Sequence, residues 1–168
     1  MRIPGVELDH AFADALHDSV VFREWILSGG RFARYAAAAT LLWDEQGNAR
    51  RAKFWWKHWW CRMPDGSEGE TDIFVVFEID KARRFALHIE NKPPHGKLAF
   101  EQANAYRRRA AYKSNDPLWL NYEVFEVLIV ASQTFLSDND ECVRQFDRAI
   151  SYENIARYVP LFGQALED

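Results

Sequence analysis

Two carboxylates and a lysine stand where a simple strand pattern brings them together. Residues 73–79 and 85–92 both alternate apolar and polar side chains, which is typical of β-strands with one buried face. If these strands pair as a hairpin with a three-residue loop, Asp72 lies directly across from Glu90, and Lys92 shares their face. Mg²⁺ is commonly held by one or two carboxylates plus substrate phosphate, and a nearby ammonium stabilises charge on a phosphate under attack. The spacing therefore predicts metal-assisted chemistry at a phosphate.

A structural interpretation of the same residues stays open. Acids and bases that alternate on the outer face of a hairpin form a solvated ladder of charges in many proteins, with no ligand involved. Glu70 precedes Asp72 by two residues and so shares its side of the chain, which makes Glu70 the preferred third acid. Glu68 lies two residues further back and is left as an alternative.

Three short motifs resemble the PD-(D/E)XK nuclease superfamily. In chain order they are Gly69-Glu70-Thr71-Asp72-Ile73, Ile89-Glu90-Asn91-Lys92 and Gln102-Ala103-Asn104-Ala105-Tyr106. The sequence looks most like small bacterial nuclease-like proteins that carry a Glu-Thr-Asp, an Ile-Glu-Asn-Lys and a Gln-x-x-x-Tyr. Two departures are visible: Thr71 stands where the superfamily's name has proline, and Pro93-Pro94 follows the lysine where relatives often have small or apolar residues.

The resemblance implies a metal-dependent nuclease that hydrolyses phosphodiester bonds, with DNA as the expected substrate. It implies that Asp72, Glu90 and the backbone carbonyl of Asn91 bind Mg²⁺ or Mn²⁺, with Glu70 as a further ligand. Lys92 would stabilise the attacking water or the developing charge. The rival interpretation is a non-catalytic nucleic-acid-binding or assembly protein that retains a nuclease-like fold.

The helix predicted over residues 97–113 carries the third motif and a basic run. In relatives the equivalent of Gln102 orients the catalytic lysine or its water. Tyr106, four residues on, shares the face of Gln102, and is expected to join that network, to contact phosphate, or to pack in the core. Arg107, Arg108 and Arg109 fan out over most of a helical turn, so we expect one or two of them to contact the nucleic-acid backbone.

The first predicted helix, over residues 7–28, carries a candidate of its own. Leu8, Phe12, Leu16 and Val20 recur at four-residue spacing, and two glycines follow at 29 and 30. Glu24 lies on this helix, and nucleases of the superfamily often place an acid there near the metal. A solvent-facing glutamate explains Glu24 equally well.

Net charge is −4, but the basic and acidic residues are segregated along the chain. Residues 81–113 hold nine bases against two acids, and residues 31–62 hold seven against two. After residue 114 there are ten acids and three bases. The negative total is therefore compatible with a basic groove around an acidic metal site.

Tryptophans dominate residues 53–61, which we predict to be the first strand of the sheet. Alternation would send Trp56 and Trp60 to one face and Trp55 and Trp59 to the other. Core packing or a homodimer through this strand is the favoured explanation, and base stacking is the alternative.

The remaining pattern predicts a single α/β domain over residues 1–168, with a mixed central sheet and flanking helices. Further helices are expected over residues 31–43, 141–150 and 152–165, the last capped by Ser151, with a turn over 44–48 and a central strand over 122–131. The superfamily's restriction-endonuclease-like αβββαβ core is consistent with this order. No signal-like or membrane-spanning run occurs, and Cys61 and Cys142 are too few for a disulfide framework, so we expect a cytoplasmic protein with no membrane partner.

Overall fold

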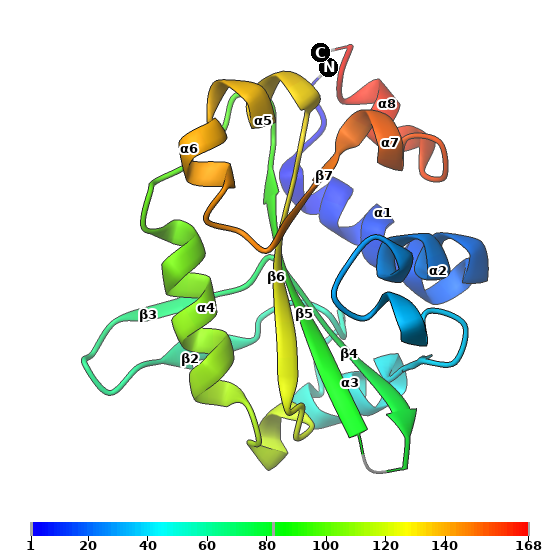
Figure 1. Cartoon of the computed structure of the whole chain (residues 1–168), viewed down its shortest axis with the longest axis vertical. Helices are drawn as coiled ribbons and strands as arrows, with labels where there is room; N and C mark the ends of the chain where they lie inside the picture. The colour runs from blue at the N-terminus through cyan, green and yellow to red at the C-terminus, as the bar shows by residue number, and fades with distance from the viewer. Residues whose placement is uncertain (1, 82, 168) are drawn as a thin grey trace.

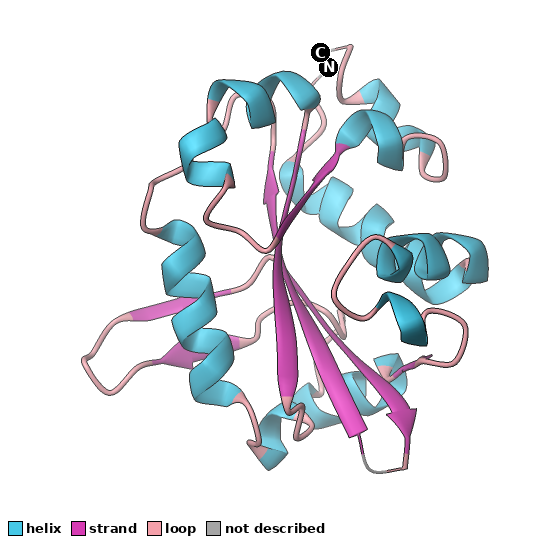
Figure 2. Ribbon diagram, in the orientation of Figure 1, coloured by secondary structure: helices cyan, strands magenta, loops and turns pink. Residues whose placement is uncertain are grey.

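The computed structural model describes residues 2–81 and 83–167 and confirms a mixed α/β architecture (Figures 1 and 2). The five-stranded sheet has the order β1 (Thr40–Leu41), β4 (Ile73–Asp80), β5 (Arg83–Lys92), β6 (Val124–Ala131) and β7 (Arg148–Ser151). Strands β1, β4 and β5 pair antiparallel, whereas β5, β6 and β7 run parallel. A separate two-stranded sheet pairs β2 (Trp60–Arg62) with β3 (Glu68–Glu70).

The central hairpin has the predicted register. Ile73 pairs with Ile89 and Phe77 with Phe85, so the same register sets Asp72 opposite Glu90 at the open end. A bulge between Glu78 and Asp80 shifts the pairing near the turn. The expectation of one solvent-facing side was wrong, because the other side of the hairpin is also buried.

Helices from both chain ends cover one face of the sheet (Figure 1). They are α1 (Gly5–Asp18), α2 (Val20–Ser28), α7 (Tyr152–Ile155) and α8 (Pro160–Gln164). The single helix predicted over 7–28 is two helices, because the Ser19 hydroxyl accepts from the Phe22 N–H and starts a new helix there. Leu8, Phe12 and Leu16 are fully buried as expected, while Val20, beyond the break, is 55% exposed.

The opposite face is covered by α4 (Gln102–Lys113), α5 (Gln133–Asp138) and α6 (Asp140–Val143). Ala103 and Tyr106 of α4 pack with Val127 and Ile129 of β6. The helix predicted from residue 97 begins only at Gln102. This packing places the Gln-x-x-x-Tyr motif over the end of the hairpin.

The tryptophan-rich segment was wrongly predicted as one strand. Only Trp60–Arg62 is extended, and His58 has a left-handed φ of 62°, which interrupts any strand there. Trp56 belongs to the core beneath α1, and Trp59 packs against Phe74 on the other face. Most of the aromatic run thus fills the core on both sides of β4, while Trp60 is 53% exposed.

Two further assignments between residues 31 and 50 were wrong, because tertiary contacts override local propensity. The segment over 31–43 contains only a short 3₁₀ turn, η1 (Ala33–Tyr35), and the edge strand β1, since Phe32 stacks on Phe85 at 4.1 Å. The expected turn over 44–48 lies inside α3 (Trp43–Arg50). There the Gln46 side-chain amide accepts from Val76 N and donates to Phe74 O, which satisfies backbone groups in a buried stretch of β4.

The C-terminal elements are shorter than predicted. The helix expected over 141–150 is α6 followed by β7, whose pairing with β6 requires an extended backbone. Ser151 caps α7 through the Asn154 N–H as expected, but Pro160 lacks an N–H and begins α8 instead of continuing α7. A second 3₁₀ turn, η2 (Pro117–Trp119), precedes β6. Across the described part of the chain, no helix has the length and apolar character needed to span a bilayer.

Candidate active site

The predicted carboxylate pair meets at the open end of the β4–β5 hairpin. Asp72 precedes β4, and its Oδ2 accepts from the Asn91 backbone N–H at 2.9 Å. Its carboxyl group also hydrogen-bonds that of Glu90, which is 3% exposed. Burial, followed by the charges of Glu90 and Asp9, raises the pKa of Asp72 to about 8. Asp72 therefore holds a proton near neutral pH in the absence of a cation.

Glu90 is the centre of a hydrogen-bond network from β5 and α4. Lys92 Nζ lies 2.7 Å from Glu90 Oε1, and Gln102 Nε2 donates to the same oxygen at 2.6 Å. The Tyr106 hydroxyl donates to Glu90 Oε2 and accepts from the Asp72 backbone N–H at 3.3 Å. Glu90 thus contacts the lysine of its own motif and both named residues of the Gln-x-x-x-Tyr motif.

Tyr106 lies inside the site and belongs to its hydrogen-bond network. It is 3% exposed, and its pKa is raised well above its usual value by burial and by the neighbouring Glu90 and Asp72 charges. The neutral phenol therefore remains a hydrogen-bond donor to Glu90 throughout the ordinary pH range. Its hydrogen bonds hold Glu90 and the backbone of Asp72 in place.

A third acid, Asp9 of α1, was missed by the sequence interpretation. It is 8% exposed, and its Oδ1 accepts from the Asn91 side-chain amide at 2.6 Å. Burial raises its pKa to about 6, although the Asn91 hydrogen bond and the Lys57 charge oppose the shift. The signal was present: helical spacing puts residue 9 beside Leu8 and Phe12, and an acid on an apolar face needs an explanation.

Asn91 joins the two faces of the sheet at this site. Its backbone N–H holds Asp72, and its side-chain amide donates to Asp9. Its side-chain oxygen accepts from the Tyr152 hydroxyl of α7. The backbone carbonyl of Asn91 was predicted to be a metal ligand. Asn91 lies within β5 and pairs with Val130 of β6.

The other predicted acids have partners or places of their own. Glu70 of β3 lies 3.4 Å from the His58 ring, and Glu68 lies 3.5 Å from Arg62. Glu24 is on α2, after the helix break, whereas the acid that reaches Asn91 comes from α1. In residues 2–81 and 83–167, no three His, Cys, Asp or Glu side chains form a group that could hold a metal ion. A metal here would therefore depend on two carboxylates and on oxygen atoms from elsewhere.

The three arginines of α4 are held by the protein itself. Arg107 pairs with Asp147 at 3.0 Å, and Arg108 pairs with Asp65 at 2.8 Å. Arg109 lies over the Tyr106 ring at 4.9 Å, with a guanidinium nitrogen 3.5 Å from the Glu70 carbonyl. Any phosphate that they contact would compete with these interactions.

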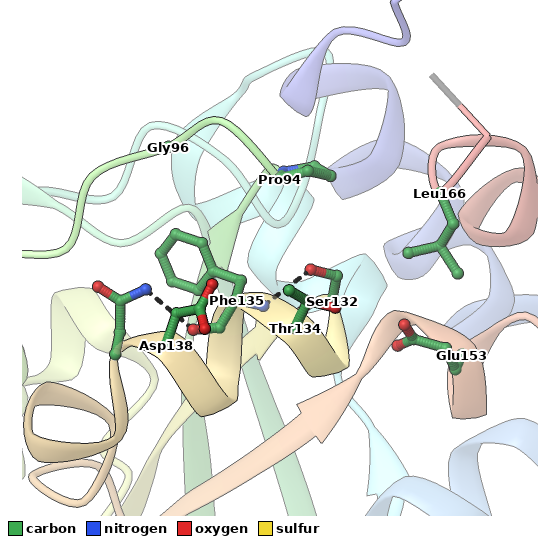
Figure 3. Close-up of a pocket in the computed structure, with 9 residues that line it drawn as sticks. Pro94, Gly96, Ser132, Thr134, Phe135, Asp138, Glu153 and Leu166 are labelled. Atoms are coloured by element: carbon green, nitrogen blue, oxygen red, sulfur yellow. Dashed lines mark hydrogen bonds between the residues drawn. The ribbon is translucent and has the colours of Figure 1, made fainter.

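A cavity of about 420 Å³ opens beyond the carboxyl ends of β5 and β6 (Figure 3). It is lined by Pro94 and Gly96 from the loop after Lys92, and by the polar side chains of Ser132, Asp138 and Glu153. None of Asp9, Asp72, Glu90 or Lys92 lines it. The acid site and this cavity are thus neighbouring but separate features of the same sheet edge.

Comparisons with protein-family models, with curated proteins and with solved structures find no match for this chain. The functional argument therefore depends on the geometry described above and on the motif resemblance.

Proposed function

We propose that this protein is a metal-dependent nuclease that hydrolyses phosphodiester bonds, with DNA as its expected substrate. The observation that carries the proposal is the meeting of Asp72, Glu90 and Lys92 at one end of the hairpin. The proposal includes the fold: we propose that it matches the restriction-endonuclease-like core of the PD-(D/E)XK superfamily. The mixed sheet and the helix that carries Gln102 beside Glu90 support it.

The donor set fits Mg²⁺ or Mn²⁺. Hard cations take carboxylate oxygens, and Mg²⁺ is often bound by one or two carboxylates together with water and substrate phosphate. Burial, and then the charge of Glu90, raises the pKa of Asp72, and a cation bound between the two carboxylates would favour its ionised form. When bound, such a cation would polarise the scissile phosphate and lower the pKa of a coordinated water.

The protein's own side chains would position the cation and neutralise the charge that develops on the phosphate. Asp72 and Glu90 would present oxygens to the cation, with Asp72 held by the Asn91 N–H and Glu90 by Gln102 and Tyr106. Lys92 would exchange its contact with Glu90 for the phosphate oxygen on which charge develops. Because the carboxylates are buried and anchored from several elements, little reorganisation would accompany substrate binding.

The test is cleavage of linear and supercoiled DNA by the purified full chain with Mg²⁺, with Mn²⁺ and with EDTA. Wild type should cleave only with a divalent ion, and Glu90→Gln should lose cleavage because it removes a ligand charge. Glu68→Gln is the matched control, since Glu68 is on the separate hairpin and pairs with Arg62. Metal-independent cleavage, or equal loss in both variants, would refute the assignment. DNA binding without cleavage under every condition would instead favour the non-catalytic binding protein.

A further inference from the structure

A second cavity, of about 230 Å³, lies at the opposite end of β5 from the acid site. Four arginines line it: Arg31 and Arg34 from the segment around η1, and Arg83 and Arg84 from the start of β5. Glu123 is a carboxylate in the same lining. Since β5 has ten residues, the two ends are roughly 30 Å apart at about 3.3 Å per residue. Contacts at this cavity are therefore independent of the chemistry at Glu90.

The charges of this lining are only partly balanced within the protein. Arg83 pairs with Asp80 at 2.8 Å, and Arg84 pairs with Glu45 and Glu78, both at 2.9 Å. Over the residues that the structure describes, Arg31 and Arg34 have no carboxylate within ion-pair distance. The buried Glu126 nearby is already paired with Arg148 at 2.9 Å, so it does not balance Arg31 either.

The segment that carries the two unbalanced arginines is held firmly in place. The Arg31 N–H donates to Glu126 Oε2 at 2.7 Å, and its guanidinium donates to the Phe125 carbonyl at 3.1 Å. Phe32 is stacked on Phe85, and the Arg34 guanidinium lies over the Tyr35 ring at 4.7 Å. Guanidinium groups fixed in this way lose little conformational freedom when they bind an anion.

We propose that this cavity binds a phosphate group of a nucleotide or of a nucleic-acid strand, with Arg31 and Arg34 as the main contacts. Guanidinium donors match the geometry of phosphate oxygens and form strong charge-assisted hydrogen bonds with them. Arg83 and Arg84, although paired, add to the positive potential of the lining. Glu123 opposes it. The guanidinium groups of Arg34 and Arg83 already lie over the Tyr35 ring, at 4.7 and 5.6 Å, so we assign phosphate contacts and no base stacking to this site.

The experiment uses the full chain and two probes: adenosine monophosphate, followed by calorimetry, and a fluorescein-labelled single-stranded oligonucleotide, followed by anisotropy with EDTA present. Arg31→Ala/Arg34→Ala should weaken binding of at least one probe by about tenfold or more, as expected for lost hydrogen bonds to charged groups. For the oligonucleotide, the slope of log affinity against log salt should fall by about 0.7 per lost contact. Glu123→Gln should strengthen binding severalfold, because it removes the opposing charge.

The control is Arg144→Ala, which removes an exposed arginine that pairs with Asp140 on α6. It should leave both affinities unchanged, and circular dichroism should show native folding in all variants. Weakening for the monophosphate alone identifies a free nucleotide as the ligand, and weakening for the oligonucleotide identifies a strand. The proposal is overturned if wild type binds neither probe, if the double variant binds as well as Arg144→Ala, or if Glu123→Gln weakens binding. Both readouts measure binding and neither measures cleavage, so failure here is distinct from failure of the nuclease assignment.

Discussion

The two ends of β5 treat charge in opposite ways. At the carboxyl end, Asp9, Asp72 and Glu90 are drawn into the interior, and the pKa values of the two aspartates rise because burial disfavours their charged forms. At the amino end, Arg31 and Arg34 stay at the surface, where water already solvates them. Burying like charges costs electrostatic free energy, which a proton or a bound cation relieves, whereas an exposed basic lining attracts anions without destabilising the fold.

The largest expected effect is on catalysis at the acid end. Lys92→Ala should reduce metal-dependent cleavage by on the order of 100-fold or more, because a preorganised charge near the developing oxyanion is lost. DNA binding by anisotropy should change little, since the basic lining at the other end remains. Lys97→Ala, which removes an exposed lysine five residues later, is the matched control. Cleavage at the wild-type rate by Lys92→Ala would remove Lys92 from the reaction.

Stabilisation by metal should be the next largest effect. A cation that binds only the folded state stabilises it by about 2.7 kcal/mol at a hundred times its Kd. For a domain of this size the melting temperature rises by roughly 2–4 °C per kcal/mol, so saturating Mn²⁺ should shift wild type by several degrees. Asp72→Asn should lose most of that shift, and Glu68→Gln should keep it. An equal shift in wild type and Asp72→Asn would mean that Mn²⁺ binds elsewhere.

The pH dependence of stability in the metal-free protein distinguishes a buried Asp72 with a raised pKa from an ordinary aspartate. The folded-state pKa of Asp72, about 8, is above its ordinary value of 3.8, so the folded state binds the extra proton. Its contribution to stability is complete below pH 3.8 and is lost as the pH rises toward 8, at up to about 1.4 kcal/mol per pH unit. Asp72→Asn should therefore be more stable than wild type near pH 8, by urea unfolding in EDTA. A variant less stable than its parent at that pH would show that the carboxylate is not strained.

The sequence pattern predicted the residues at the acid end of β5 better than those at the basic end. The period-2 alternation predicted the hairpin register, and with it the position of Asp72 opposite Glu90. Helical spacing paired Gln102 with Tyr106 on one face, where both now contact Glu90. These residues are positioned by local periodicity, which the sequence displays directly.

The residues that were missed are positioned by long-range contacts. Asp9 reaches the site through Asn91, more than eighty residues away, and Arg31 and Arg34 are placed by Glu126 and by stacking on Phe85. The tryptophan run looked like a strand because alternation cannot show that each ring fills a different gap in the core. No local pattern encodes such packing. In the alanine-rich segment near η1, helix propensity predicted a helix, but tertiary contacts impose another structure.

A buried histidine behind the acid site gives a prediction of opposite sign to that of Asp72. His88 is 1% exposed, is hydrogen-bonded through Nδ1 to Thr71 at 3.2 Å, and burial lowers its pKa to about 3. Its ordinary value is 6.5, so the unfolded state gains a proton first as the pH falls. Stability should therefore decline between pH 6.5 and about 3, at up to about 1.4 kcal/mol per unit.

The measurement for His88 is urea unfolding at pH 7 and pH 5 for wild type, His88→Phe and His95→Gln. Phenylalanine suits the aromatic surroundings of Phe74, Tyr122 and Phe125, and within the described residues the Nε2 of His88 has no hydrogen-bond partner to lose. His88→Phe should lose less stability than wild type between these pH values. His95, on the exposed loop, should behave as wild type. A His88→Phe loss as large as that of wild type would assign the acid sensitivity to other groups.

The smallest effect is expected from an arginine that is already paired. Arg108 and Asp65 are both about half exposed, and such solvated surface pairs contribute little to stability, so Arg108→Ala should lower stability only slightly. Because Asp65 occupies its guanidinium, Arg108 should also contribute less to nucleic-acid binding than Arg34 does. Anisotropy across a salt series should therefore give a slope close to wild type for Arg108→Ala and a reduced slope for Arg34→Ala. The reverse order would move the nucleic-acid contact from the segment around η1 back to α4, and with it the anionic ligand from the basic end of β5 to the neighbourhood of the acids.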